Sequence, residues 1–178
     1  MEKKIINEIL EWVKTISVSL ILAFAITLIV QPTIVNGSSM YPTLETEDYL
    51  VVNKLAYKDK VPQRGDIVVF KSEIINDKTY KKKNLVKRVI ALPEERIVIE
   101  NGKVYIDNKE LDENYIENMN TEGNVDIVVP KNHIFVMGDN RSNSLDSREP
   151  VIGTVSLESV IGKVAIRLYP FNKIDRIK

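Results

Sequence analysis

The chain has 178 residues, and its 25 basic and 25 acidic side chains give a formal net charge of zero. Since no basic excess is available to neutralise phosphates, nucleic acid is not an implied partner. The sequence contains no cysteine, which excludes disulfides and thiolate metal sites, and only one histidine, His133, which narrows the choice of catalytic base.

The N-terminal part of the chain has the features of a membrane anchor. Residues 1–14 mix lysines with apolar residues at helical spacing, which predicts a cytoplasmic amphipathic segment or the amphipathic start of a longer helix. Residues 15–35 carry no charge, and their apolar core is close to the ~20 residues that a membrane-spanning helix requires. We therefore expect a transmembrane anchor over residues 15–35 and a folded domain over residues 36–178.

A cleaved secretory signal is the alternative to a retained anchor. An Ala-Phe-Ala tripeptide at residues 23–25 offers small residues at a cleavage spacing, but it lies inside the apolar run, which favours retention. Lys3, Lys4 and Lys14 precede the helix, whereas the next lysines come well after it. This distribution favours a cytoplasmic N-terminus, and so a single-pass protein of the cell membrane with an extracytoplasmic folded domain.

The stretch 36–45 follows the anchor and reads Asn-Gly-Ser-Ser-Met-Tyr-Pro-Thr-Leu-Glu. Gly, Ser, Asn and Pro are the usual turn formers, so this stretch can be an ordinary loop. However, Ser38 and Ser39 stand where an anchor meets a folded domain, and a serine there could be a nucleophile that works at a membrane surface. Residues further along the chain decide between the two interpretations.

The rest of the chain predicts short strands with turn signals about every 8–12 residues. Asn-Gly at residues 101–102, between two alternating apolar runs, is a strong hairpin signal. The charged stretch 71–83 predicts an exposed loop, and residues 111–124 are acidic and irregular. Strands are expected at residues 49–52, 67–70, 85–92, 96–100, 103–107, 126–129, 133–137, 151–155 and 160–168.

The stretch 85–92 predicts a strand that is apolar on both faces apart from Lys87 and Arg88. Such a strand is typically buried on both sides. Burial removes the hydration of an ammonium group and lowers its pKa, so Lys87 could be a neutral base near neutral pH. The alternative is that Lys87 extends from the sheet edge into solvent.

Several motifs follow one another along the chain. They are the anchor, Gly-Ser-Ser-Met-Tyr-Pro-Thr-Leu at 37–44, Arg-Gly-Asp-Ile-Val at 64–68, Val-Lys-Arg-Val-Ile-Ala-Leu-Pro at 86–93, Met-Gly-Asp-Asn-Arg at 137–141, Asn-Ser at 143–144 and Asp-Ser-Arg at 146–148. In this order they closely resemble the bacterial type I signal peptidases, or leader peptidase family. These are membrane-bound serine proteases that remove signal peptides from exported proteins. The resemblance covers nearly the whole chain.

The resemblance implies a Ser-Lys dyad in which Ser39 is the nucleophile and Lys87 is the general base. It implies that Ser144 hydrogen-bonds the Lys87 amine and orients it. It also assigns supporting pairs, Arg88 with Asp139 and Asp146 with Arg148, and it places Gly37, Ser38 and Met40 around the oxyanion and the substrate. Pairing Arg88 with Asp139 would leave Lys87 without a carboxylate partner, which would otherwise raise its pKa.

Two other catalytic arrangements fit the sequence less well. A Ser-His-Asp triad would need His133, which lies at the start of a predicted strand and is expected to be structural or on the surface. A Ser-x-x-Lys arrangement is absent because Pro42 stands three residues after Ser39.

One position departs from many members of the family, in which a serine two residues before the nucleophile supplies a hydroxyl to the oxyanion hole. Here that position is Gly37, as in other members. The Ser39 backbone N–H can still donate. Because losing a donor would cost on the order of 3–4 kcal/mol, we expect a substitute from another backbone N–H or from Ser38.

The fold that the resemblance implies is mainly β, an antiparallel β-sheet catalytic domain with a small β insertion at about residues 94–131, preceded by one N-terminal transmembrane helix. The implied activity is an endopeptidase that cleaves preproteins after Ala-x-Ala through an acyl-enzyme, with no metal and no cofactor. The implied partners are preproteins that carry signal peptides and the lipid bilayer.

Three other hypotheses remain open at this point. A non-catalytic, membrane-anchored homologue that assists surface-polymer or pilus assembly would be expected to lose the serine or the lysine, and both are present. A self-cleaving repressor with a Ser-Lys dyad would need a DNA-binding domain where this chain has an apolar segment. A secreted β-domain with a binding function would require cleavage after that segment.

Overall fold

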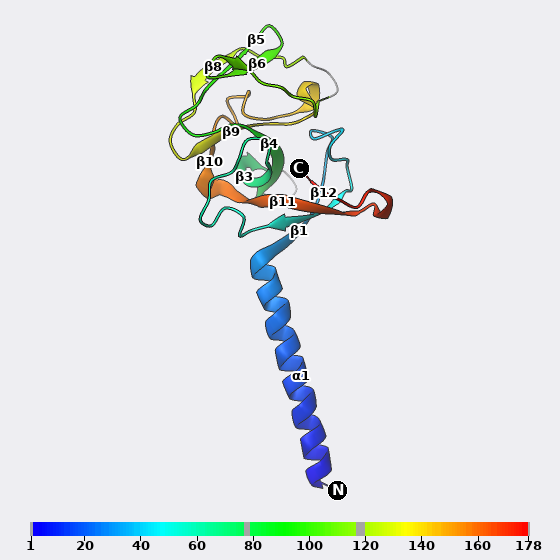
Figure 1. The fold of residues 1–178 in the computed structure, drawn as a ribbon. Coiled ribbons are helices and arrows are strands. Elements are labelled where there is room, and N and C mark those ends of the chain that lie inside the picture. The colour runs from blue at the N-terminus through cyan, green and yellow to red at the C-terminus, as the bar shows by residue number, and fades with distance from the viewer. Residues whose placement is uncertain (1, 77–78, 117–119, 178) are drawn as a thin grey trace.

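A computed structural model describes residues 2–76, 79–116 and 120–177. It begins with one uninterrupted helix, α1 (Glu2–Ile29), which projects away from the β-structure (Figure 1). Within Lys3–Ile29, a run of 18 residues has a mean hydropathy of 2.0 and no buried residue, so α1 is long and apolar enough to cross a membrane.

The helix ends at Ile29, and the chain passes directly into a strand. β1 (Val30–Ile34) pairs antiparallel with β2 (Tyr49–Asn53), so residues 30–35, which the sequence assigned to the anchor, belong to the folded domain. Pro32 explains this change, because proline lacks the N–H of a helical hydrogen bond and biases the preceding residue toward an extended conformation. The strand tolerates Pro32 because β1 lies at the edge of its sheet.

The main sheet is antiparallel and places β4 near its centre. The strands lie in the order β1-β2-β11-β3-β4-β9-β10, and β12 pairs with β11. Their bounds are β3 (Ile67–Ile75), β4 (Lys82–Ala91), β9 (His133–Met137), β10 (Val155–Ser156), β11 (Val160–Tyr169) and β12 (Asp175–Arg176). Single-turn 3-10 helices occur at Arg141–Asn143, Leu157–Ser159 and Phe171–Lys173.

A second, four-stranded sheet comes from the chain between β4 and β9. Its order is β7-β6-β5-β8, with β5 (Arg96–Glu100), β6 (Lys103–Ile106), β7 (Lys109–Glu110) and β8 (Val125–Val128). The hairpin turn has positive φ at both Asn101 (51°) and Gly102 (79°), as a two-residue turn between twisted strands requires. The prediction of a mainly antiparallel β fold behind an N-terminal apolar helix is confirmed.

Besides the end of the helix, two secondary-structure predictions are wrong. The charged stretch 71–83 was expected to be a loop, but β3 continues to Ile75 and β4 begins at Lys82. Buried Ser72 and the exposed Glu73–Lys82 ion pair hold this hairpin, and its charged side chains concealed the strand pattern. The strand predicted at 151–155 is mostly a turn, and only Val155–Ser156 form β10.

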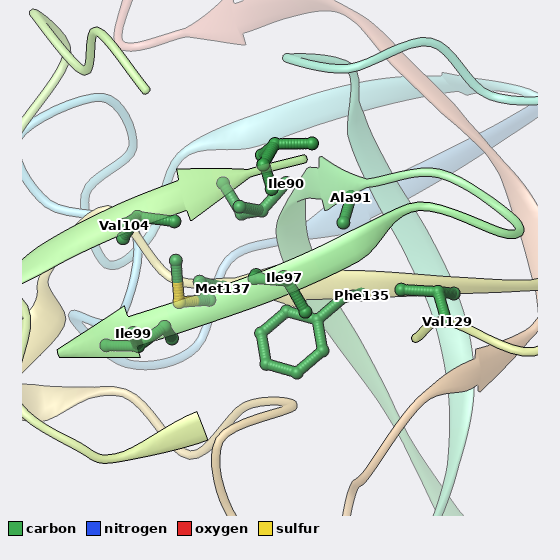
Figure 2. Close-up of a cluster of buried hydrophobic side chains, with 9 residues drawn as sticks. Ile90, Ala91, Ile97, Ile99, Val104, Val129, Phe135 and Met137 are labelled. Atoms are coloured by element: carbon green, nitrogen blue, oxygen red, sulfur yellow. The ribbon is translucent and has the colours of Figure 1, made fainter. Parts of the chain in front are cut away.

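A shared apolar cluster joins the two sheets. Ile90, Ala91, Phe135 and Met137 of the main sheet meet residues of the small sheet (Figure 2). The contributions from the small sheet and its flank are Ile97, Ile99, Val104, Ile106 and Val129. Because this cluster contains residues from the C-terminal half of β4 and from β9, which pair antiparallel, it fixes the two strands that border the candidate site.

Since β1 covers the edge of β2, we predict that removing it destabilises the domain while removing α1 alone does not. A chain that begins at Val30 should fold, whereas one that begins at Asn36 should melt at least about 5 °C lower, because β2 loses its paired neighbour beside buried Leu50 and Val52. Thermal denaturation followed by circular dichroism compares the two. Equal melting temperatures would show that β1 contributes nothing to the domain.

Candidate active site

The loop between β1 and β2 presents Ser39 between two buried anchors. Met40 and Leu44 both lie in the apolar core that contains Leu50 and Val164. Leu44 N donates to Met40 O over 2.8 Å, which closes one helical turn just after the serine. Ser39 is half-buried directly before this turn, so its position is fixed by the core and not by solvent-exposed backbone.

Lys87 reaches Ser39 from the centre of the main sheet. It is 3% exposed, and its Nζ lies 2.5 Å from Ser39 Oγ. Arg88, which follows Lys87, is the first residue of β4 that pairs with β9, so β9 does not pair with Lys87, and the serine loop contacts β4 at that residue. Burial lowers the pKa of Lys87 to about 8, against the opposing carboxylates of Asp146 and Asp139 and with the help of the positive charge of Arg148.

The predicted pair of Arg88 and Asp139 is present and buried. Arg88 Nε and Nη2 donate to the two Asp139 oxygens over 2.9 and 2.7 Å. Thr43 Oγ1 donates to Asp139 Oδ2 over 2.5 Å, and Arg88 Nη1 donates to Gly65 O over 2.9 Å. The bidentate pair therefore connects β4, the serine loop and the loop after β9, and it engages Asp139 with groups other than Lys87.

The second predicted pair shapes the loop after β9. Arg148 Nε and Nη2 donate to Asp146 over 2.9 and 3.0 Å, and Gly138 N donates to Asp146 Oδ2 over 3.0 Å. Arg148 Nη2 also donates to Arg141 O over 2.7 Å. These bonds hold both ends of the stretch 138–148 against each other.

The loop after β9 also hydrogen-bonds to Ser38 and Ser39. Asn140 N donates to Ser39 O over 3.0 Å, Asn140 Nδ2 donates to Ser38 O over 3.1 Å, and Asn143 Nδ2 donates to Ser38 Oγ over 2.9 Å. Gly138 allows this close approach, because a Cβ there would lie 2.4 Å from Ser39 O and 2.2 Å from Ser144 Oγ. A side chain at residue 138 would therefore push the two loops apart.

Ser144 lies beside Gly138, but the predicted hydrogen bond to Lys87 is not formed. The Ser144 Oγ atom is buried and has no hydrogen-bond partner among the residues that the structure describes. Burying a hydroxyl without a partner is unfavourable, so this oxygen is available to a group that enters the site.

The residues assigned to the oxyanion and the substrate differ in what they offer. Gly37 adopts a φ of +109°, a conformation that favours glycine, and Ser38 Oγ accepts the Asn143 amide. The Met40 side chain is 1% exposed and lies in the core, which leaves only its backbone for a substrate.

The sequence interpretation gave no role to Glu113, Tyr115, Thr121 and Arg141, which form a buried network next to the site. Glu113 pairs with Arg141, and the Tyr115 ring lies 4.1 Å from the Arg88 guanidinium carbon. The irregular segment 111–124 carries no periodic signal that would show these contacts.

His133 lies at the opposite end of β9 from Gly138. Its Nδ1 lies 3.0 Å from Lys131 O, which is a local turn contact. In the ranges 2–76, 79–116 and 120–177, no group of three or more His, Asp or Glu side chains is arranged to hold a metal ion.

Comparison with known proteins places this geometry in a family. Residues 9–169 match the family described as "Signal peptidase, peptidase S26". The chain is 36% identical to signal peptidase I P of Bacillus subtilis subsp. natto, over 99% of this chain and 98% of that relative. It is 35% identical to signal peptidase I S of Bacillus subtilis strain 168, over 96% and 94% of the two chains.

A crystal structure of a signal peptidase I from Enterococcus faecalis V583 aligns with 60% of this chain and 98% of that one, at 31% identity and a TM-score of 0.49. The family match runs from within the apolar helix to the last residue of β11. The chain therefore belongs to the peptidase S26 family and is a signal peptidase I, a serine-type peptidase that cleaves signal peptides.

Proposed function

We propose that the chain is a membrane-anchored endopeptidase in which Ser39 attacks the scissile carbonyl and Lys87 is the general base. The observation that carries this proposal is the 2.5 Å contact between Ser39 Oγ and the buried Nζ of Lys87. A nucleophile within hydrogen-bond reach of a base is the geometric requirement for activating a serine.

The lowered pKa supplies the second requirement, a neutral amine. A lysine with the ordinary pKa of 10.5 is neutral in about one molecule in a thousand at pH 7.5. With a pKa of about 8, roughly one molecule in four has a neutral Lys87 at that pH. Desolvation of this one side chain thus raises the fraction of competent enzyme by more than about a hundredfold.

The proposed reaction follows from these positions. Neutral Lys87 takes the hydroxyl proton of Ser39 while Oγ bonds to the carbonyl carbon of the substrate. The resulting ammonium group gives its proton to the leaving amine, the C–N bond breaks, and the mature chain departs with a new N-terminus. Lys87 then takes a proton from water, hydroxide attacks the ester, and Ser39 recovers its proton as the signal peptide leaves.

The developing oxyanion needs at least two donors. The Ser39 backbone N–H is one, and we assign the hydroxyl of Ser38 as the second. Ser38 Oγ accepts the Asn143 amide proton over 2.9 Å, which fixes the oxygen while leaving its own proton free to donate. This arrangement would compensate for the missing side chain at Gly37.

The setting of the site supports a substrate that arrives at a membrane surface. We propose that α1 spans the cell membrane with its N-terminus in the cytoplasm, so that the β-domain meets exported preproteins on the extracytoplasmic side. Small residues, typically alanine, are proposed at the first and third positions before the cut. The non-catalytic alternative is weakened because Ser39 and Lys87 are not only present but in contact.

Replacing either member of the dyad should abolish cleavage. Detergent-solubilised enzyme should cut a preprotein with an Ala-x-Ala site after the last alanine, whereas Ser39→Ala and Lys87→Met should each lose at least about a thousandfold in kcat. Circular dichroism confirms that the variants are folded. Near-wild-type activity of a folded Lys87→Met enzyme would refute the dyad.

The pH profile should report the titration of Lys87. Because the base must be deprotonated, kcat/KM should rise with pH, reach half its maximum near pH 8 and level off above it. The unfolded chain binds more protons between pH 8 and 10.5, so stability should also rise across that window, by up to about 3 kcal/mol. Lys87→Met should lack this rise in denaturant unfolding, and a flat rate profile between about pH 6 and 10 would count against Lys87 as the base.

Two substitutions distinguish a role of the Ser38 hydroxyl as an oxyanion donor from a purely structural role in the loop. Asn143→Ala removes only the amide that holds Ser38, whereas Ser38→Ala removes the hydroxyl as well. If the hydroxyl stabilises the oxyanion, Ser38→Ala should lower kcat by at least about tenfold more than Asn143→Ala. Equal effects of the two substitutions on kcat would limit Ser38 to a structural role.

A further inference from the structure

Three side chains from the segment between β7 and β8 reach β4 and the loop after β9, the two segments that contact Ser39. Glu113 and Thr121 both contact the guanidinium of Arg141, and Arg141 Nη1 donates to Glu113 Oε2 over 2.9 Å. Tyr115 places its ring 4.1 Å from the guanidinium carbon of Arg88. The segment therefore contacts the site at two separate points.

The first point acts on the serine loop. Arg141 Nε donates to Gly138 O over 3.1 Å, and Gly138 is the residue at which the two loops approach too closely for a Cβ. The neighbouring Asn140 N holds Ser39 O over 3.0 Å. An Arg141 fixed by Glu113 thus determines where Gly138 lies, and with it the backbone against which Ser39 rests.

The second point acts on the lysine strand. Arg88 directly follows Lys87 in β4, and its guanidinium contacts both Asp139 and the Tyr115 ring. The Tyr115 hydroxyl donates to Glu113 Oε1 over 2.6 Å, so one carboxylate orients both the ring on Arg88 and the guanidinium of Arg141. A cation held against an aromatic face loses freedom of movement, which restrains the strand beside the catalytic amine.

The burial of this network carries a desolvation cost that its pairing offsets only in part. The side chains of Arg141 and Glu113 are only 3% and 6% exposed. A buried ion pair often stabilises a protein no better than apolar residues of the same size, because both charges lose their hydration. Glu113 bonds to Arg141 and Tyr115, so it reaches the dyad through those two residues.

We propose that Glu113 and Tyr115 are positioning residues that hold the Ser39–Lys87 pair in its reactive geometry, acting through Arg141 and Arg88. The small sheet then has a direct function in catalysis besides packing on the main sheet. This inference rests on the proposed dyad, and the test below separates the two.

The test compares two variants with matched controls in the full-length enzyme. Tyr115→Leu removes the ring from Arg88 without burying a new unpaired charge, and Glu113→Gln keeps the size of the side chain while removing its charge. Tyr105→Leu and Glu110→Gln make the same substitutions in β6 and β7, where Tyr105 is half-buried and Glu110 is in an exposed ion pair. Each variant is assayed on the same preprotein at a pH above 9, where Lys87 is deprotonated.

We expect kcat per folded molecule to fall about threefold to thirtyfold in Tyr115→Leu and at least about tenfold in Glu113→Gln, with KM within about twofold of wild type. Both controls should keep kcat within about twofold. Glu113→Gln combined with Arg141→Gln should be no slower than the slower single variant, because the two residues act as a unit.

A purely structural role would lower the melting temperature and leave kcat of the folded fraction unchanged, which would overturn the inference. If Glu113→Gln does not fold, Tyr115→Leu decides the question alone. Lys87→Met is assayed alongside the variants. If it is inactive while Tyr115→Leu equals wild type, only the positioning role fails, whereas an active Lys87→Met would refute the dyad itself.

Discussion

The proposed dyad depends on one constraint: the amine of Lys87 must be desolvated enough to lose its proton and must still contact the serine. Lys87 meets it by lying on an interior strand, 3% exposed, with its Nζ 2.5 Å from Ser39 Oγ. The desolvation that lowers its pKa is opposed by two nearby carboxylates, so any carboxylate in direct contact would restore the ammonium form. The remainder of the site can be understood as a way to keep acidic side chains close by but occupied.

Arginine side chains engage these acidic groups. Two buried carboxylates lie near Lys87, and each is held by a guanidinium: Asp139 by Arg88 and Asp146 by Arg148. A third, Glu113, is held by Arg141 in the adjoining network. Guanidinium groups are suited to this use, since they stay charged at every relevant pH and bind a carboxylate through a planar pair of donors. The Arg88–Asp139 pair also joins β4 to the loop after β9, and the Glu113–Arg141 pair joins the segment between β7 and β8 to that same loop.

The main outline of the fold could be predicted from the sequence because its signals are local. The doubly apolar run around Lys87 and the Asn-Gly turn of the small sheet are both read within about ten residues, and both proved correct. The end of the helix was missed because β1 forms only by pairing with β2. The first residue of β2, Tyr49, comes nineteen positions after the first residue of β1, Val30, so no local signal shows the pairing. The hairpin at 71–83 was missed because charged side chains on its exposed face mimic a loop.

Within the site, the paired residues were predicted from the resemblance to a family. Composition and periodicity alone do not predict contacts between segments that are distant in the sequence. The Arg88–Asp139 pair is present, whereas Ser144 Oγ lacks the expected bond to Lys87. Glu113 and Tyr115 escaped notice because they lie in an irregular segment whose order comes from Arg141 and Arg88 and not from its own periodicity.

Because α1 passes directly into β1, no flexible linker separates the helix from the β-domain. A flexible linker would let a domain range over a distance that grows with the square root of linker length. Here β1 is hydrogen-bonded into the sheet, and only residues 35–38 separate it from Ser39. If α1 spans the membrane as proposed, Ser39 lies at a fixed height above the end of the helix, and the scissile bond of a substrate has to reach that height.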